Sequence, residues 1–244
     1  MKDNFSSQAA QYAKYRPVFP PELTSYIISL VQCHEHAWDC GTGNGQLAQL
    51  ISPYFKKIFA TDISAQQLEN AVQIQNIIYS KQPAEKTLFE HDFFDLVTVG
   101  QAVHWFQFDA FFAEVDRVLK AGGILALAGY NLFSISAAID PVISEFYRSS
   151  IGPYWDKERK YVDEAYKTIP FPFQEIEVPE FTIRLNWTFD QLTGYLKTWS
   201  AVKHFEKKNG FNPVDDILPT IKEQWGNAAS AEVNFPVICR IGRK

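Results

Sequence analysis

Cysteine is scarce in this sequence, and the few cysteines lie far apart. Cys33, Cys40 and Cys239 are odd in number and form no C-x-x-C pair. Neither a disulfide framework nor a thiolate zinc site is therefore indicated. Because unpaired cysteines are typical of reducing compartments, the sequence predicts a cytoplasmic protein.

Long apolar runs are also missing. No stretch approaches the roughly 18 consecutive apolar residues that a membrane-spanning helix needs. The first residues, MKDNFSSQAAQYAKYRP, contain no apolar core of a secretory signal. We therefore expect neither secretion nor a membrane partner.

Positive charge is in short supply as well. The 28 Asp and Glu residues outnumber the 23 Lys and Arg residues, which gives a formal net charge of −5. Proteins that bind nucleic acid need an extended positive surface to neutralise phosphates. Nucleic acid is therefore disfavoured as a partner, and a small-molecule substrate is expected instead.

A metal centre has little support in the sequence. His34 and His36 form an H-E-H stretch ahead of the first predicted strand, but no third ligand follows nearby. Zinc sites use three or four protein ligands. We therefore expect no metal.

The sequence does contain enough apolar residues for one sizeable core. Of 244 residues, 46% are hydrophobic and 15% are aromatic, so one domain with an attached subdomain is expected. Apolar runs alternate with helical patterns in the first half, which is typical of an α/β protein with a mostly parallel, doubly wound sheet. The predicted strands are 36–41, 57–64, 77–85, 94–106 and 124–130, and the predicted helices are 23–32, 45–55, 65–75 and 109–123.

The composition changes near Leu132, where aromatic residues become frequent. We expect residues 1–131 to form a core and residues 132–244 to form an inserted, aromatic-rich helical cap together with the final strands of a seven-stranded sheet. Helical patterns cover 135–169, 189–210 and 215–226, an edge strand or hairpin is predicted at 173–188, and a last strand is predicted at 231–244.

Alternating glycines follow the first predicted strand. The stretch WDCGTGNGQL has the pattern D-x-G-x-G-x-G, formed by Asp39, Gly41, Gly43 and Gly45. Glycine tolerates positive φ and lets a ligand approach the backbone closely, so such a loop between a strand and a helix is typical of nucleotide binding. Asp62 ends the second predicted strand, where a carboxylate can accept both hydroxyls of a ribose. Loop and carboxylate together predict an adenosine-containing cofactor.

The residue after the loop helps to choose between adenosine cofactors. Gln46 stands where a dinucleotide-binding loop has its third glycine or an alanine, which lets the helix pack under a pyrophosphate. S-adenosylmethionine has no phosphate, so this departure favours it over NAD. An NAD-dependent oxidoreductase and a non-catalytic nucleotide-binding protein on the same fold stay open as alternatives.

These features resemble the class I S-adenosylmethionine-dependent methyltransferases, in particular the small-molecule group that includes trans-aconitate methyltransferase. The resemblance is good over residues 5 to 130 and looser beyond them. It implies a Rossmann-like methyltransferase fold with S-adenosylmethionine as the cofactor. The stretches that carry it are YAKYRPVFPPEL, WDCGTGNGQLAQLI, ATDIS, PAE, FDLVTVGQAVHWF, RVLKAGG and, more distantly, YLKTWSAV.

The resemblance also implies roles for individual residues. The glycines would flank the methionine part of the cofactor, and an N-terminal lid helix would fold over it. Trp105 and Phe106 have a second interpretation as core aromatics. The implied cofactor-binding residues are Tyr12 and Arg16 on the lid, Asp39, Gly41, Gly43, Gly45, Asp62 and Ile63 around the loop and ribose, Ala84 and Glu85 at the adenine, and Gln101 near the sulfonium. His104 and Gln101 are the implied catalytic residues, and His104, Trp105 and Phe106 the implied substrate pocket.

The methyl acceptor is the least determined part of the prediction. DNA amino-methyltransferases carry an N/D-P-P-Y/F tetrapeptide after the fourth strand, where this chain has GQAVHW, and three scattered cysteines do not supply the thiols for arsenite methylation. A carboxylate or hydroxyl oxygen, methylated by in-line SN2 displacement, remains. His104 would position a carboxylate, which is ionised at pH 7, or act as general base for a hydroxyl. A monomer and a homodimer are both open.

Overall fold

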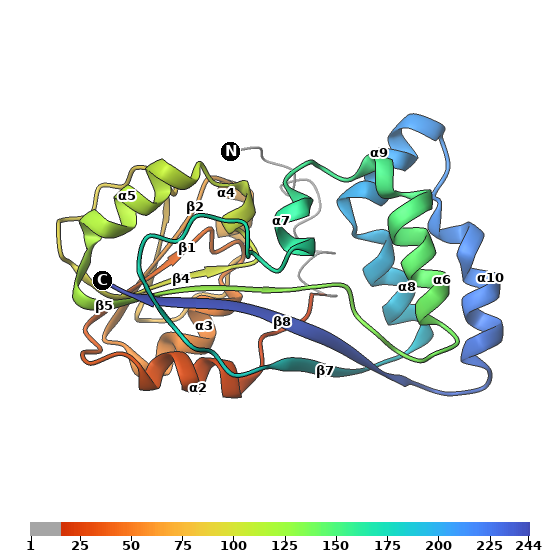
Figure 1. The fold of residues 1–244 in the computed structure, drawn as a ribbon, viewed down its shortest axis with the longest axis horizontal. Coiled ribbons are helices and arrows are strands. Elements are labelled where there is room, and N and C mark those ends of the chain that lie inside the picture. The colour runs from red at the N-terminus through yellow and green to blue at the C-terminus, as the bar shows by residue number, and fades with distance from the viewer. Residues whose placement is uncertain (1–15) are drawn as a thin grey trace.

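The computed structural model describes residues 16–244, and they form two lobes joined by long strands (Figure 1). One lobe is a sheet covered by helices, and the other is a helical cap. Tyr12, which the sequence places on a lid, lies outside the described residues.

The sheet has the strand order β3-β2-β1-β4-β5-β8-β6, and β7 also pairs with β8. The strands are β1 (His36–Cys40), β2 (Lys57–Asp62), β3 (Ile77–Lys81), β4 (Phe94–Gly100), β5 (Leu119–Tyr130), β6 (Gln174–Ile176), β7 (Thr182–Trp187) and β8 (Ala231–Arg243). The first five strands are parallel to one another, and β8 runs antiparallel to β5. The predicted α/β class with a mostly parallel, doubly wound sheet is confirmed. Strand order reverses between β1 and β4, which is where open α/β sheets bind ligands.

The strands β6 and β7 follow one another along the same edge of β8. Pairing of β6 ends with Ile176 opposite Ile241, and pairing of β7 begins with Thr182 opposite Pro236, a register shift of a single residue. The predicted edge strand over 173–188 is therefore present with one interruption. Counted this way, the sheet has the seven strand positions that the sequence predicts.

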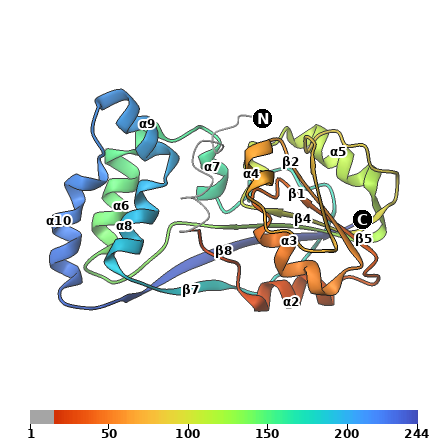
Figure 2. The same ribbon diagram turned by 180° about the vertical axis from the view of Figure 1, so that it is seen from behind.

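Strand residues alternate between two apolar layers. Ala37 packs in the layer that holds helices α2 (Pro21–Ser29) and α3 (Gln46–Ile51), whereas Trp38 packs in the layer that holds α5 (Phe108–Val118). Figures 1 and 2 show α2 and α3 on one side of the sheet, and α5 with the short α4 (Ala65–Glu69) on the other. Both faces of the central strands are thus buried, as is typical of parallel sheets.

The boundary between α5 and β5 differs from the prediction. The helix predicted over 109–123 ends at Val118, and β5 begins directly at Leu119. Gly122 has a φ of +78° within a stretch where the register between β4 and β5 shifts. Gly122 therefore allows the backbone to bend at an irregularity within β5, and it does not end a helix.

The helix predicted over 65–75 is also too long, because α4 stops at Glu69. Val72 is 54% exposed. The segment after α4 therefore offers no continuous apolar face on which a further helical turn could pack.

The cap is helical but more broken than its sequence pattern predicts. Gly152 and Pro153 end the first helical run, since proline removes an amide donor and glycine weakens a helix. The division into residues 1–131 and 132–244 stays a prediction. The cap elements are α6 (Asp140–Glu145), which continues into the π-turn η4 (Phe146–Ser150), the 3-10 turn η5 (Gly152–Tyr154), α7 (Arg159–Asp163), α8 (Phe189–Lys197), α9 (Ser200–Asn209) and α10 (Val214–Trp225).

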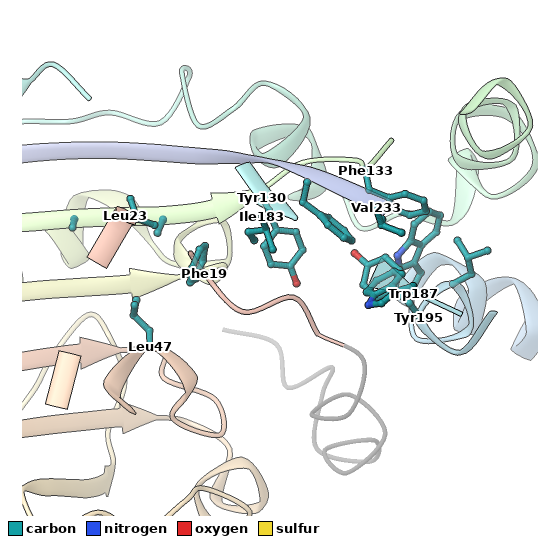
Figure 3. Close-up of a cluster of buried hydrophobic side chains, with 14 of the residues drawn as sticks. Phe19, Leu23, Leu47, Tyr130, Phe133, Ile183, Trp187, Tyr195 and Val233 are labelled. Carbon is teal, nitrogen blue, oxygen red and sulfur yellow. The ribbon is translucent and has the colours of Figure 1, made fainter. Parts of the chain in front are cut away.

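Core and cap share one cluster of aromatic side chains (Figure 3). Tyr130, the last residue of β5, has its ring centroid 6.2 Å from that of Phe19 and 5.5 Å from that of Phe235. Phe235 in turn packs 5.5 Å from Tyr195 of the cap. Continuous aromatic packing therefore holds the cap beside the carboxyl ends of the parallel strands.

Candidate functional site

The glycine loop after β1 adopts the backbone conformation that its sequence predicts. Gly41, Gly43 and Gly45 have φ values of +66°, +57° and +84°. A Cβ atom on Gly45 would overlap the Tyr79 hydroxyl, and one on Gly41 would lie 2.8 Å from the Ala102 side chain. Glycine is required at both positions by backbone conformation and by close packing.

Asp39 is buried at the end of β1 and holds the loop and the following helix. Its Oδ2 accepts hydrogen bonds from the Thr42 hydroxyl (2.5 Å) and the Ala48 amide (3.1 Å), and its Oδ1 accepts one from the Thr98 hydroxyl (2.9 Å). Burial raises the pKa of Asp39 to about 6, although the hydrogen bonds oppose the shift. Ala48 lies in the first turn of α3, so Asp39 satisfies an amide that would otherwise need a cap.

Asp62 lies opposite the loop at the end of β2. Its Oδ2 accepts a hydrogen bond from the Gly43 amide (2.9 Å), and its Oδ1 accepts one from the Ser64 amide (2.9 Å). These two bonds orient the carboxylate toward the glycine loop. The geometry suits a group that receives two neighbouring hydroxyls.

A cavity of about 890 Å³, open to solvent, lies between the glycine loop, Asp62 and the end of β4. We call it the cofactor cavity. Its lining residues are Arg16, Pro17, Phe19, Asp39, Gly41, Thr42, Gly43, Asn44, Gln46, Leu47, Asp62, Ile63, Ser64, Gln67, Gly100, Gln101, Ala102, Trp105 and Tyr130.

A second cavity of about 630 Å³ lies between the end of β4 and the cap. We call it the acceptor cavity. The two cavities share the lining residues Arg16, Gln101, Trp105 and Tyr130. The remaining lining residues of the acceptor cavity are His104, Trp155, Asp156, Arg159, Tyr195, Thr198, Trp199 and Ser200.

Gln101 forms part of the wall between the cavities. Its Oε1 accepts a hydrogen bond from the Tyr130 amide (2.8 Å), and its Nε2 donates one to the Tyr130 carbonyl (3.3 Å). Its φ of +53° is uncommon for a residue with a side chain. Gly129 makes room for this arrangement, since a Cβ there would lie 2.7 Å from the Gln101 Oε1. The strained backbone and the paired bonds hold Gln101 and Tyr130 together.

His104 is buried in the 3-10 turn η3 (Val103–Trp105) that follows β4. Burial lowers its pKa to about 3, and the positive charges of Arg159 and Arg16 act in the same direction. The imidazole is therefore neutral at physiological pH. Its Nδ1 lies 3.5 Å from the Tyr166 hydroxyl, whose pKa burial raises.

Several residues that the sequence implicates do not border either cavity. Ala84 is buried among apolar residues, and the Glu85 Oε1 accepts a hydrogen bond from the Gln107 amide (3.0 Å) at the start of α5. The Phe106 ring packs beneath Gly41, 3.0 Å from where a Cβ would stand. Phe106 is thus a core aromatic residue, which was the second interpretation of its sequence position.

The sequence pattern missed most of the acceptor cavity. Arg159 stands in the charged stretch DKERKYVDE, where nothing separates it from surface residues, and Trp155 and Trp199 are two of the many aromatic residues of the predicted cap. Only the fold brings these residues opposite His104. Gln67 was missed too, because its burial is visible in the structure and not in the sequence.

Within residues 16–244, no group of His, Cys, Asp and Glu side chains could hold a metal ion. No helix in the same residues is long and apolar enough to cross a membrane.

Comparison with known proteins decides the family. A family model described as a methyltransferase domain matches residues 38–127. A Dictyostelium discoideum protein assigned as a methyltransferase is 33% identical, over 99% of this chain and 95% of that protein. This chain belongs to the class I S-adenosylmethionine-dependent methyltransferases. A solved structure from Anaeromyxobacter dehalogenans, assigned as a type II methyltransferase, is also 33% identical, has a TM-score of 0.88 and covers 94% of this chain and 98% of its own.

The methyltransferase fold and its cofactor are thereby confirmed, and the oxidoreductase alternative is not favoured. A solved phosphoethanolamine N-methyltransferase 2 from Haemonchus contortus, in complex with S-adenosylmethionine, shares the fold at a TM-score of 0.50 and 18% identity, over 98% of this chain and 57% of its own. The narrower resemblance to trans-aconitate methyltransferase stays a prediction.

The residues of the cofactor cavity fit S-adenosylmethionine. Gly43 has a positive φ, and among residues 16–244 no heavy atom lies closer than 4.0 Å to its Cβ position, so its backbone is open to a ligand. Asp62 offers acceptors for hydroxyls, and Asp39 adds a second carboxyl group on the wall of the cavity. Acidic groups suit a cofactor with a positive sulfonium and a positive amino group.

Proposed function

We propose that this methyltransferase transfers the methyl group to an oxygen of a small molecule held in the acceptor cavity. The observation that carries the proposal is the common wall of the two cavities, made by Arg16, Gln101, Trp105 and Tyr130. Ligands in the two cavities would meet at this wall. Holding two reactants in such contact is worth effective molarities of about 10⁵–10⁸ M.

The chemistry needs little beyond alignment. When bound, S-adenosylmethionine would supply a methyl group on a positive sulfur, and an acceptor oxygen would form the new C–O bond as the C–S bond breaks and its electron pair passes to sulfur. Trp105 and Tyr130 offer apolar surface that excludes water from this contact. The paired hydrogen bonds of Gln101 fix Tyr130 at the wall. In this proposal Gln101 acts by positioning.

His104 favours a carboxylate over a hydroxyl as the acceptor. A general base works best when its pKa lies near the operating pH, whereas burial and two guanidinium groups lower the pKa of His104 to about 3. A carboxylate carries no proton that must be removed. The protonated Tyr166 hydroxyl can donate to Nδ1, which leaves Nε2–H as a donor that holds an acceptor oxygen.

A panel of small molecules tests the proposal. Each member is incubated with the protein and S-adenosylmethionine, and methylated products and S-adenosylhomocysteine are measured by mass spectrometry. The panel holds carboxylic acids, alcohols and amines on matched carbon skeletons. We expect methyl esters from acids. Turnover of amines alone, or of no small molecule, would contradict the proposal.

A further inference from the structure

The guanidinium group of Arg159 is the most prominent charge in the acceptor cavity. Arg159 opens α7, and its side chain is 21% exposed. Its Cζ lies 4.7 Å from the ring centroid of Trp155 and 5.3 Å from that of Tyr147. Stacking on aromatic rings fixes the plane of a guanidinium group at little entropic cost.

One edge of this guanidinium group is occupied by the protein. Its Nε donates to the Tyr147 hydroxyl (2.6 Å) and to Asp163 Oδ1 (3.3 Å), and the same Tyr147 hydroxyl donates to Asp163 (2.5 Å). Among residues 16–244, neither terminal nitrogen, Nη1 nor Nη2, has a hydrogen-bond acceptor. Two parallel N–H groups at the end of a fixed guanidinium match a carboxylate bidentately.

Positive charge also dominates the interior of the cavity. Arg159 and Arg16 both line it, and both lower the pKa of His104 after the larger effect of burial. Of the nearby acids, Asp163 pairs at the Nε edge and is 43% exposed, whereas Asp156 lines the cavity beside His204, 3.9 Å from its Nδ1.

Arg159 lines the acceptor cavity and not the cofactor cavity. A group held by Arg159 therefore lies away from the common wall, where the methyl group would be transferred. We propose that Arg159 anchors a carboxylate of the substrate that is distinct from the oxygen being methylated. The substrates are then small organic acids with a second oxygen nucleophile, such as dicarboxylates. This inference rests on the proposed function.

Paired ligands test the inference on the wild-type protein. Short aliphatic dicarboxylates and terephthalate are each compared with their own monoamide, which keeps one carboxylate and loses the other. We expect kcat/KM to fall by roughly 10- to 100-fold from diacid to monoamide, the effect of losing a charge-assisted pair. Equal turnover of diacid and monoamide would overturn the inference.

Variants assign the effect to Arg159. Arg159→Gln should raise KM for the diacids by at least about tenfold with a smaller change in kcat, and Arg159→Lys should restore part of the loss. The monoamides should be insensitive to either change. Arg148→Gln, on the exposed surface of η4, is the matched control and should behave as wild type. Unchanged affinity for S-adenosylhomocysteine checks that the variants are folded.

The outcomes separate the inference from the proposed function. If monoacids or alcohols are methylated as well as diacids, and Arg159→Gln has no effect, oxygen methylation stands and the anchor is wrong. If amines alone or no small molecules are methylated, the proposed function fails and the inference with it. If Arg159→Gln does not fold, the ratio of diacid to monoamide turnover in the wild type decides.

Discussion

The cofactor cavity and the acceptor cavity share a wall but are built in different ways. The first is made mainly by the glycine loop and the chain that follows it as far as Gln67, together with residues at the end of β4, Tyr130 and the segment 16–19. The second is made by large side chains, Trp155, Arg159, Tyr195 and Trp199, that stand on separate cap elements. One cavity therefore depends on local backbone geometry, and the other on tertiary packing.

This difference explains what each cavity can recognise. Positive φ angles and backbone amides suit one ligand whose shape is constant, as a cofactor's is. Side chains on a cap can be exchanged without altering the sheet, and a fold supports different substrates in this way. We therefore expect substitutions in the loop to act on cofactor binding and folding together, and substitutions in the cap to act on the acceptor alone.

The largest effect is expected from Gly45→Ala. Gly45 and Gly210 both have a φ of +84°, but a Cβ on Gly45 meets Tyr79, whereas one on Gly210 meets no atom of the described part of the chain within 4 Å. Left-handed strain costs about 1–2 kcal/mol, so Gly210→Ala should lower the free energy of unfolding by about that amount and leave cofactor affinity unchanged. Gly45→Ala should cost more and weaken S-adenosylhomocysteine binding by roughly 100-fold or more, since strain and overlap add.

Urea unfolding and calorimetry measure both quantities. Equal effects of the two substitutions would show that close packing at the loop does not matter. The claim that the cofactor cavity depends on the local geometry of the glycine loop would then be wrong.

Asp62→Ala should weaken S-adenosylhomocysteine binding at least about tenfold. The change removes an acceptor of charge-assisted hydrogen bonds, each worth about 1.5–3 kcal/mol, and releases the Gly43 and Ser64 amides. Asp116→Ala, a change at an exposed carboxylate, serves as the control. Calorimetry that gave equal affinities for the two folded variants would remove Asp62 from the cofactor site.

Asp39 should give the loop a pH dependence. Burial raises its pKa from 3.8 to about 6 in the folded protein. The folded state then binds the proton more tightly than the unfolded state, so its stabilising contribution is complete below about pH 4 and is lost as the pH rises through 6. Relative to Asp39→Asn, the wild type should lose up to about 3 kcal/mol of unfolding free energy over that range. Urea titrations from pH 4 to 7 would refute this if the difference stayed constant.

The smallest effect is expected from His104→Gln. With a carboxylate acceptor, the glutamine amide replaces the neutral imidazole as a hydrogen-bond donor, so much of kcat should remain. The pH profile of kcat should show no limb near 6.5, because the pKa of His104 lies near 3. A loss of about 10²–10⁴-fold would instead identify a general base and a hydroxyl acceptor.

The same contrast describes how far the sequence could predict the molecule. The sheet, the glycine loop and Asp62 follow from local patterns, because apolar periodicity and glycine spacing act over a few residues. Two helices predicted from local patterns are too long, and in both cases packing decides the boundary. Val72 is exposed beyond the end of α4, and β5 begins at Leu119 where the helix was predicted to continue. The sequence could not identify Arg159 as a site residue, because its contacts with Trp155 and Tyr147 form only when the cap folds.

The stereochemistry of transfer tests most directly the claim that the methyl group passes straight across the common wall. S-adenosylmethionine with a methyl group made chiral by hydrogen isotopes is turned over with the best acid of the panel, and the configuration of the product methyl group is determined. One in-line displacement between the two cavities predicts inversion. Retention would mean two displacements through a group on the protein, and would contradict the account.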